Sequence, residues 1–351
     1  RIKLIMAFTT INKSTDYFNT LTYTGDDGTN RSITGVGFQP DFIWFKDRSN
    51  AFNHYLFDII RDGQTYYISS NNNAAEATDT TSLKSMDSDG FTVGASAGVN
   101  GNNNNYVAWN WKANGTGAAN TAGSINSTVS ANTTSGFSIV SFTGTGANAT
   151  VGHGLGVAPK MIIVKGRSFV DNWCVFHSSL GGGKKVRLNT TGAEISTTES
   201  WNSTSPTSSV FSVGLDGETN NNGSTMIAYC FADVQGYSKF GSYTGNGNAD
   251  GSFISTGFSP AFVMIKQTTG TGKWVMKDNR RTGINVNQST IYANTSEAEG
   301  TPGYELIDLL SNGFKQRGTG SYVNGSGTPY IYMAFAEEPL VGTNNVPATA
   351  R

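Results

Sequence analysis

The stretch that decides the fold is PDFIWFK at residues 40–46, because it returns as PKMIIVK at 159–165 and as PAFVMIK at 260–266. An aromatic-Thr-Gly step precedes each proline by 17 positions, from Tyr23 to Pro40 and likewise in the other two copies. Two further positions recur at similar distances after the proline in each copy. The first is a phenylalanine (Phe91, Phe211, Phe314), and the second is an aromatic residue in the last strand (Trp111, Phe231, Phe335). The sequence therefore predicts three tandem copies of one domain of about 100 residues.

Short runs rich in Val, Ile, Phe and Tyr alternate with Gly, Asn and Asp throughout each copy, and this pattern is typical of strands joined by turns. We predict an all-β fold of three tandem homologous β-sandwich domains, jelly-roll-like in character. The predicted boundaries are an N-terminal arm (1–16), repeat 1 (17–112), a Gly/Asn/Ser/Thr linker (113–135), repeat 2 (136–235), repeat 3 (236–340) and a C-terminal tail (341–351).

Three finer expectations follow from the same reading. The run after each repeated proline is apolar at nearly every position, so both faces of that strand should be covered, with Phe42, Ile162 and Phe262 in equivalent core strands. One or two helical turns are expected around residues 81–86 and 304–310. Because 113–135 resembles a flexible linker and repeats 2 and 3 have none between them, repeat 1 is expected to be freer than the other two.

Composition narrows the possible partners. Charged residues are only 14% of the chain and the formal net charge is −1, so we expect no nucleic-acid partner and no attraction to an anionic membrane. No apolar window reaches the length of a membrane span, and no secretory signal is evident, which predicts synthesis in a host cytoplasm. Met6 resembles a natural start. Cys174 and Cys230 are expected to be buried free thiols, with a bridge between their strands as the alternative.

The sequence nominates no catalytic, cofactor-binding or metal-binding residue. The three histidines, His54, His153 and His177, lack a second ligand at metal spacing and are expected to be structural or on the surface. The acids fall mostly in turn motifs such as Asp26-Asp27-Gly28 and Asp250-Gly251, and the sequence nominates no pair of carboxylates for glycan hydrolysis. A lysine closes each apolar run, and it is interpreted either as a strand end reaching solvent or as a cation shared between neighbouring domains or subunits.

Asn- and Gly-rich hairpins before the last strand of every copy are the candidate exposed binding loops. A tight turn explains them as well, because Asn and Gly tolerate positive φ. In the functional reading, nearby Tyr106, Trp201 or Trp274 would provide a surface on which a sugar stacks. The candidate residues are Asn102, Asn103, Asn104, Asn105, Asn220, Asn221, Asn222 and Asn324.

Five segments of the chain resemble a family of tandem-repeat virion or tail-fibre-like proteins encoded by tailed bacteriophages, especially those of marine bacteria. They are MAFTTI…YFNT, ITGVGFQPDFIWFK, GHGLGVAPKMIIVK, YCFADVQGYSKFGSYTGNG and YIYMAFAEEP, and the likeness extends from Met6 to Pro339. The resemblance implies a virion structural protein and carries over no catalytic residue.

The function expected from sequence is therefore a non-enzymatic phage virion protein, a tail fibre or receptor-binding appendage located on the virion. Capsid decoration or a head fibre is the alternative, and a carbohydrate-active virion enzyme is the third. Expected partners are further copies of the chain (a homo-oligomer, and a trimer if it forms a fibre), other virion proteins, and a host surface glycan or protein.

Overall fold

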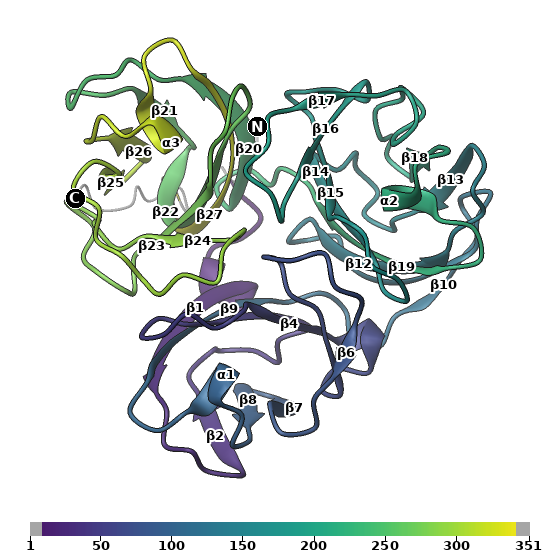
Figure 1. Cartoon of the computed structure of the whole chain (residues 1–351), viewed down its shortest axis with the longest axis horizontal. Coiled ribbons are helices and arrows are strands. Elements are labelled where there is room, and N and C mark those ends of the chain that lie inside the picture. The colour runs from purple at the N-terminus through teal and green to yellow at the C-terminus, as the bar shows by residue number, and fades with distance from the viewer. Residues whose placement is uncertain (1–8, 342–351) are drawn as a thin grey trace, which may run out of the picture.

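The computed structural model describes residues 9–341, and within them the chain is almost entirely strands and turns. Three lobes surround a common centre (Figure 1). The described helices are all brief: η1 (Ser14–Asp16), η2 (Ile59–Arg61), α1 (Ala97–Asn100), α2 (Gly217–Asn220) and α3 (Ser321–Asn324). The fold is all-β with several sheets, as predicted. Residue Met6 and the C-terminal tail beyond 341 lie outside the described residues.

Repeat 1 contains an inner sheet in the order β1-β9-β3-β4 and an outer sheet in the order β2-β8-β7, with a small β5-β6 hairpin beside them. Every pairing in these sheets is antiparallel. The strands are β1 (Phe18–Thr24), β2 (Arg31–Thr34), β3 (Phe42–Asp47), β4 (Tyr55–Asp58), β5 (Tyr66–Tyr67), β6 (Ala77–Thr78), β7 (Leu83–Asp87), β8 (Gly90–Val93) and β9 (Asn105–Trp111).

Repeat 2 has the same inner strand order, β12-β19-β14-β15, and extends it on both sides to the eight-stranded sheet β10-β11-β12-β19-β14-β15-β16-β17. Its outer sheet is the pair β13-β18. The strands are β10 (Ala118–Asn120), β11 (Ser127–Asn132), β12 (Phe137–Thr143), β13 (Ala149–Gly152), β14 (Met161–Gly166), β15 (Cys174–His177), β16 (Lys184–Arg187), β17 (Ile195–Ser196), β18 (Val210–Val213) and β19 (Thr225–Phe231).

Repeat 3 again shows the inner order, in the sheet β20-β27-β22-β23-β24, with the outer sheet β21-β26-β25. The strands are β20 (Ser238–Thr244), β21 (Phe253–Ser255), β22 (Phe258–Gln267), β23 (Trp274–Asp278), β24 (Ile291–Tyr292), β25 (Ile307–Leu310), β26 (Gly313–Gln316) and β27 (Pro329–Pro339).

Each inner sheet buries both of its faces, which explains the continuous apolar runs. Alternate residues of β3 face two different cores: Ile43 and Phe45 pack with Phe91 of the outer sheet, whereas Phe42 and Trp44 face the other two repeats. The predicted phenylalanines Phe91, Phe211 and Phe314 are fully buried in the separate cores of their own repeats. Ile162 lies in the predicted strand, β14, but it faces the core of repeat 2, and Met161 is the residue that faces the common core.

The second core is shared by all three repeats and lies at the centre of Figure 1. Here the equivalent aromatic residues Trp111, Phe231 and Phe335 meet one another, with ring centroids 6.4, 5.7 and 6.0 Å apart. Phe42 of repeat 1 stacks on Tyr229 of repeat 2 at 4.5 Å. The inner sheets thus cover each other, and repeat 1 is packed as closely as the others, contrary to the expectation that it would be freer.

Two local expectations from the sequence are corrected. Residues 113–135, expected to form a flexible linker, contain β10 and β11, because Ile125 and Val129 provide buried anchors for a segment that otherwise looks featureless. The helical turns expected around 81–86 and 304–310 are replaced by strands β7 and β25, whose residues pair with β8 and β26. Sheet pairing supplies hydrogen bonds that a short helix in water does not.

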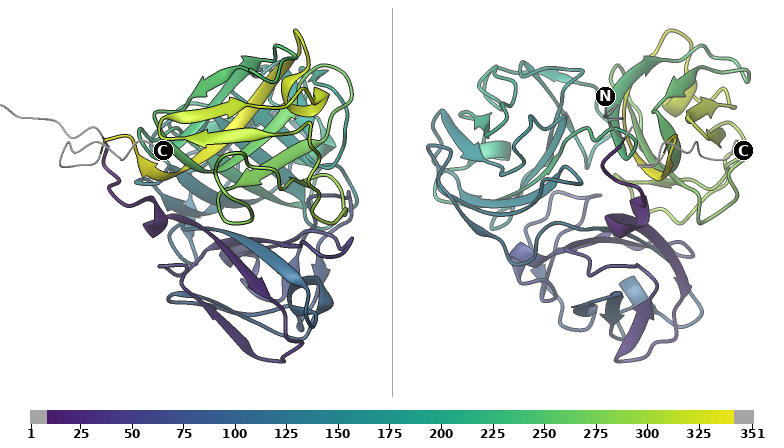
Figure 2. Two further views of the ribbon diagram at one scale, coloured as in Figure 1. Left: turned by 90° about the vertical axis from the view of Figure 1, so that its left-hand side faces the viewer. Right: turned by 180° about the vertical axis from the view of Figure 1, so that it is seen from behind.

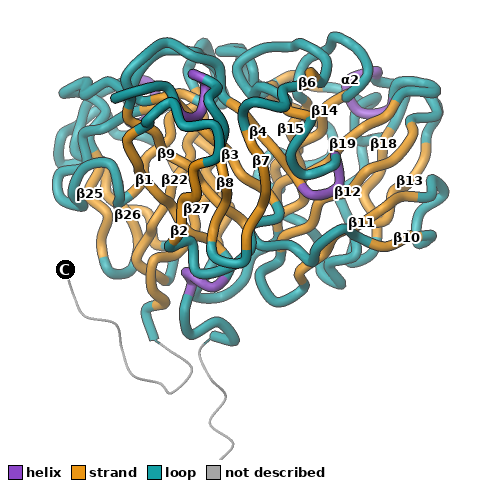
Figure 3. The backbone as a smooth tube through the Cα atoms, turned by 90° about the horizontal axis from the view of Figure 1, so that it is seen from below, coloured by secondary structure: helices purple, strands orange, loops and turns teal. Residues whose placement is uncertain are grey.

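The two ends of the described chain lie together at one end of the molecule, because Gly236 sits beside both Thr9 and Pro339. Figures 2 and 3 show this end, and Figure 3 shows α2 at the opposite one. The loops that follow β3, β14 and β22 lie at the opposite end too, because the first residue of each bonds to the start of the last inner strand of its repeat. The backbone bond from Arg48 N–H to Asn105 O places the hairpin before β9 at that opposite end. We call the two ends the terminal end and the loop end.

Truncation of a residue in the shared core tests its contribution to stability. We expect Phe42→Ala to lower the free energy of unfolding by about 3–5 kcal/mol, because it removes the ring that stacks on Tyr229 and leaves a cavity. Phe253→Ala, at a side chain 46% exposed on β21, is the matched control and should cost well under half as much. Equal losses in the two variants, measured by urea unfolding, would contradict the shared core.

Candidate functional site

The candidate binding loops lie at the loop end, each directly after a one-turn helix. Asn102, Asn103, Asn105 and Asn222 are exposed, and Asn104 and Asn221 are half-buried. At the same position of each turn one residue has a left-handed backbone conformation, with φ of 59° at Asn103, 71° at Gly223 and 69° at Gly327. The tight-turn interpretation therefore holds for all three loops, and their exposed tips are the equivalent residues Asn102, Asn222 and Ser326.

Asn220 and Asn324 are not exposed binding residues, which corrects the sequence prediction. Both are fully buried, together with the equivalent Asn100. In each repeat the amide Oδ1 accepts from a backbone N–H of the loop after the first strand, at Asp26, Thr145 or Asn246. The Nδ2 group donates to carbonyls of the surrounding loops, including Gly28, Ala147 and Asn248. All three repeats have asparagine at this position, whereas the neighbouring residues differ between the repeats, and this pattern indicates the structural role.

The aromatic residues expected to stack on a ligand beside these loops are not available to one. Tyr106, Trp201 and Trp274 are all 0–1% exposed. Tyr106 uses its hydroxyl inside the loop, where it donates to Ala97 O and accepts from the Gly101 N–H. The tips therefore present amides, hydroxyls and backbone groups, without an aromatic surface among these three residues.

Two of the junctions between repeats contain a network of ion pairs. At the junction of repeats 2 and 1, Arg167 pairs with Glu76 at 2.9 Å, and the Glu76 N–H donates to Arg167 O. Arg61 links Glu76 to Asp58, and Tyr229 of repeat 2 donates its hydroxyl hydrogen to Asp58. Arg61 and Asp58 have no exposed side-chain surface, so the pair is fully enclosed.

The junction of repeats 1 and 3 repeats this network with equivalent residues. Arg48 pairs with Glu299 at 2.9 Å, Arg281 links Glu299 to Asp278, and Trp109 donates to Asp278 at 3.0 Å. Buried ion pairs cost desolvation, so they specify how surfaces fit more than they stabilise them. The two networks accordingly fix the angle between neighbouring repeats.

The third junction, between repeats 3 and 2, keeps only the backbone part of this arrangement. The Glu194 N–H donates to Thr268 O, in the way that Glu76 and Glu299 bond their partners. Thr268 stands where the other repeats have arginine, and Glu194 pairs instead with Lys184 of its own repeat. His177 occupies the position of Asp58 and Asp278, and its Nε2 lies 3.1 Å from Tyr332 O. This junction is therefore the least charged of the three.

The repeated lysines are buried at these junctions, so the interpretation as solvent-reaching strand ends is wrong. Lys46, Lys165 and Lys266 have no exposed surface. Lys165 donates to Asn73 O of repeat 1, and Lys266 donates to Thr191 O of repeat 2. Burial lowers the pKa of each of the three ammonium groups to about 8.

All three histidines are buried in hydrogen-bonded positions. His54 accepts from Trp44 Nε1 at its Nδ1, and its Nε2 lies 3.0 Å from Tyr292 O of repeat 3. The equivalent residues Trp173 and Trp274 donate across the other two junctions to Ser69 O and Arg187 O. Burial lowers the pKa of His54 to about 3 and that of His177 to about 4, so both are neutral at pH 7.

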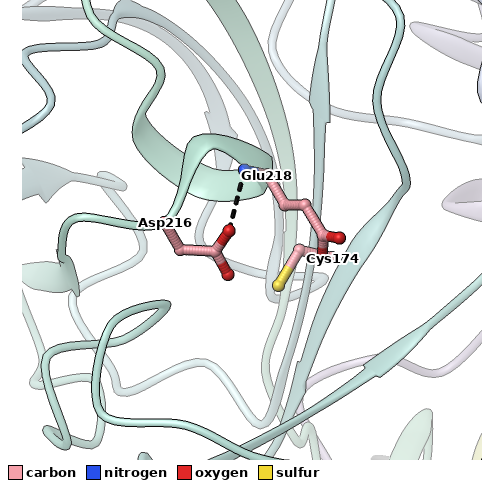
Figure 4. Close-up of side chains that lie close together, drawn as sticks. All are labelled: Cys174, Asp216 and Glu218. Atoms are coloured by element: carbon pink, nitrogen blue, oxygen red, sulfur yellow. Dashed lines mark hydrogen bonds between the residues drawn. The ribbon is translucent and has the colours of Figure 1, made fainter.

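One cluster in residues 9–341 has the composition of a metal site: Cys174, Asp216 and Glu218, whose ligand atoms lie within 4.8 Å of one another (Figure 4). Lys185 contacts both carboxylates, and Arg187 contacts Glu218. Burial raises the pKa of the Cys174 thiol, which keeps it protonated. Two cations already balance two carboxylates here, so the geometry supports an internal ion-pair cluster. Cys174 and Cys230 are both free and buried, as predicted.

These features describe an all-β protein with buried ion pairs within and between its repeats, whose three Asn/Gly-rich turns carry no charged side chain. The family model described as "Domain of unknown function (DUF7483)" matches residues 13–339, and the chain belongs to this family. No curated protein and no solved structure matches the chain. Among the helices described, none is long and apolar enough to cross a membrane.

The buried lysines predict how stability depends on pH. Their pKa of about 8 lies below the 10.5 of an exposed lysine, so between pH 8 and 9 the unfolded chain binds more protons at these positions. The free energy of unfolding should therefore rise with pH, by up to about 1.4 kcal/mol per pH unit for each lysine. The buried thiols of Cys174 and Cys230 oppose this rise, because burial raises their pKa.

Lys266→Met isolates one lysine's share of this slope, and Lys13→Met, at an exposed side chain, is the control. We expect a smaller rise between pH 8 and 9 in Lys266→Met and an unchanged rise in Lys13→Met, measured by urea unfolding at each pH. An identical slope in both variants would show that burial does not perturb Lys266.

Proposed function

We propose that the chain is a non-enzymatic structural protein of a phage virion, a tail-fibre or receptor-binding component that displays its loop end to the host surface. The observation that carries this proposal is the separation of the two ends: both ends of the described residues (9–341) lie at the terminal end, and the uncharged turns of all three repeats lie opposite. A body attached through its terminal end would present three related tips together. The resemblance to tailed-phage tandem-repeat proteins supports the virion context.

We further propose that the three repeats are homologous tandem β-sandwich domains. The recurring strand order of the inner sheets supports this, as do the equivalent buried asparagines and turn positions. The homo-oligomer expected from sequence stays a prediction. The apolar inner sheets already cover one another within one chain, so these faces do not require a second copy.

The chemistry of the tips indicates how they would recognise a ligand. Asn102, Asn222 and Ser326 are exposed and uncharged, and the arginines at the first two junctions are paired with glutamates. Recognition would rest on hydrogen bonds from amides, hydroxyls and backbone groups. Such binding to a glycan or a polar protein surface is only weakly sensitive to salt, because screening acts on charges.

Capsid decoration is the second candidate, and one observation favours it. The three lobes are arranged around one axis with both ends of the described residues on one face, a shape suited to a threefold position of a head lattice (Figure 1). In that case the terminal end would be the bound surface, and the tips would be free of any host contact.

Adsorption of the purified protein to host cells distinguishes the two roles. We expect wild-type protein to bind at low and at high ionic strength alike. The triple variant Asn102→Ala, Asn222→Ala, Ser326→Ala should lose at least about tenfold in affinity, which corresponds to roughly 1.4 kcal/mol over three tips.

The matched control changes three exposed positions at the terminal end, Gln39→Ala, Thr133→Ala and Gln235→Ala, and should bind as wild type does. The receptor role would be overturned if the wild-type protein did not bind cells but attached stoichiometrically to empty heads. Loss of that attachment in the control variant with the three terminal-end changes would establish decoration.

A further inference from the structure

The first strand of the inner sheet has a different neighbour in each repeat. In repeat 2, β12 pairs on one side with β19 and on the other with β11, over six residue pairs from Ser127–Phe142 to Asn132–Phe137. The equivalent strands β1 and β20 lie at the edges of their sheets. Ser242 of β20 and Thr22 of β1 are exposed, whereas the equivalent Ser141 under β11 is half-buried.

The outer edge of β20 has peptide groups that are ready for pairing. The Gly245 N–H donates to Thr328 O. The backbone N–H and C=O groups of the odd-numbered residues of β20 therefore point toward β27, and those of the even-numbered residues point to the outer edge. The Phe240 N–H is occupied by Asp233 Oδ1, and Thr244 O accepts from the Ser252 hydroxyl. Ser238 bonds to Val234 through both its N–H and its C=O. Ser242 directs both groups away from the sheet without a partner among residues 9–341. An unpaired edge of this kind is a template for another strand.

The structure also leaves room along this edge. A hollow of about 260 Å³ lies at the junction of repeats 3 and 2, lined by Ser242 and Thr268 on one side and by Ser179, Lys184 and Glu194 on the other. A second hollow, of about 520 Å³, lies beside Ser238 and Lys239. The first hollow lies at the junction that lacks the arginine–carboxylate network, and Thr268, which stands in place of the arginine, lines it.

We propose that β20 is a docking site for an extended polypeptide segment of a partner protein, which adds as an antiparallel strand in the register that β11 takes on β12. The chain itself supplies the precedent, since β11 covers the equivalent edge of repeat 2. Main-chain hydrogen bonds provide the affinity in such strand addition, and alternate side chains provide the specificity. Val129 of β11 pairs with Val140, whose equivalent in β20 is Gly241. The ring of Tyr332 lies over Gly241, so a side chain of the partner strand at this position would meet that ring.

Asp233 controls access to this edge. Its Oδ1 accepts from the Phe240 N–H at 2.9 Å, and its Oδ2 pairs with Lys239 at 3.2 Å. A strand in the register of β11 must displace the carboxylate from the Phe240 N–H to complete its ladder. The partner's own carbonyl replaces the carboxylate oxygen there, so removal of the carboxylate should favour docking.

The probe is a synthetic peptide with the sequence of residues 124–134, SINSTVSANTT, added to the full-length protein at millimolar concentration. Amide exchange by NMR should show slower exchange at Ser242 when the peptide is present, because the equivalent Ser141 pairs with Thr128 of β11. Ser242→Pro removes the outward N–H at an edge position where proline is tolerated, and we expect it to abolish binding. Asp233→Ala should bind about fivefold more tightly, because a competing hydrogen bond is lost.

Two controls make the outcome decisive. Thr22→Pro makes the same change at the equivalent edge of β1 and should leave binding intact. A peptide with proline in place of the residues corresponding to Thr128 and Ser130 lacks the donors that face the sheet, and it should not bind. Unchanged exchange at Ser242 with the parent peptide overturns the proposal, and so does binding that Thr22→Pro abolishes. Concentration-dependent self-association that Ser242→Pro abolishes, seen by light scattering, would identify a second copy as the occupant and also overturn it.

Discussion

The contact of Trp111, Phe231 and Phe335 around one axis is the constraint on which the rest of the structure depends. Each residue stands at the same position of its repeat, and each belongs to an inner sheet that already packs its other face against an outer sheet. An isolated repeat would expose the second apolar face of that sheet to water, at a cost proportional to its area. Mutual coverage of the three sheets removes this exposure, so the shared core makes the repeats one structural unit.

The polar groups follow from the same arrangement. Three inner sheets around an axis create three junctions, and buried cations and carboxylates are placed where equivalent loops meet. Two junctions use the same arginine, glutamate and aspartate positions, whereas the third has threonine, leucine and histidine in place of the two arginines and the aspartate. The third junction is also the one with the open strand edge of β20. One of the three junctions thus differs from the other two, which share the same charged positions.

Much of the fold could be predicted from sequence because its signal is repeated. The spacing from Tyr23 to Pro40 marks the first strand and the inner strand of each repeat, and the apolar run at 42–45 indicates a strand covered on both faces. The sequence did not show what covers the second face, since an apolar run carries no information about its partner. Strand β11 was missed because Val129 is its lone large apolar residue. Asn220 and Asn324 were misassigned because a buried asparagine that caps a loop and an exposed one in a turn occur in the same Asn/Gly-rich context.

The most direct test of the shared core is whether the three repeats unfold together. Hydrogen exchange measured by mass spectrometry across a urea transition reports on each repeat separately, through peptides that contain β9, β19 and β27. The account predicts a single cooperative transition with the same midpoint for all three, coincident with the change in tryptophan fluorescence. Separate midpoints, with one repeat losing protection while the other two keep it, would contradict the account, because the repeats would then be stable without their common core.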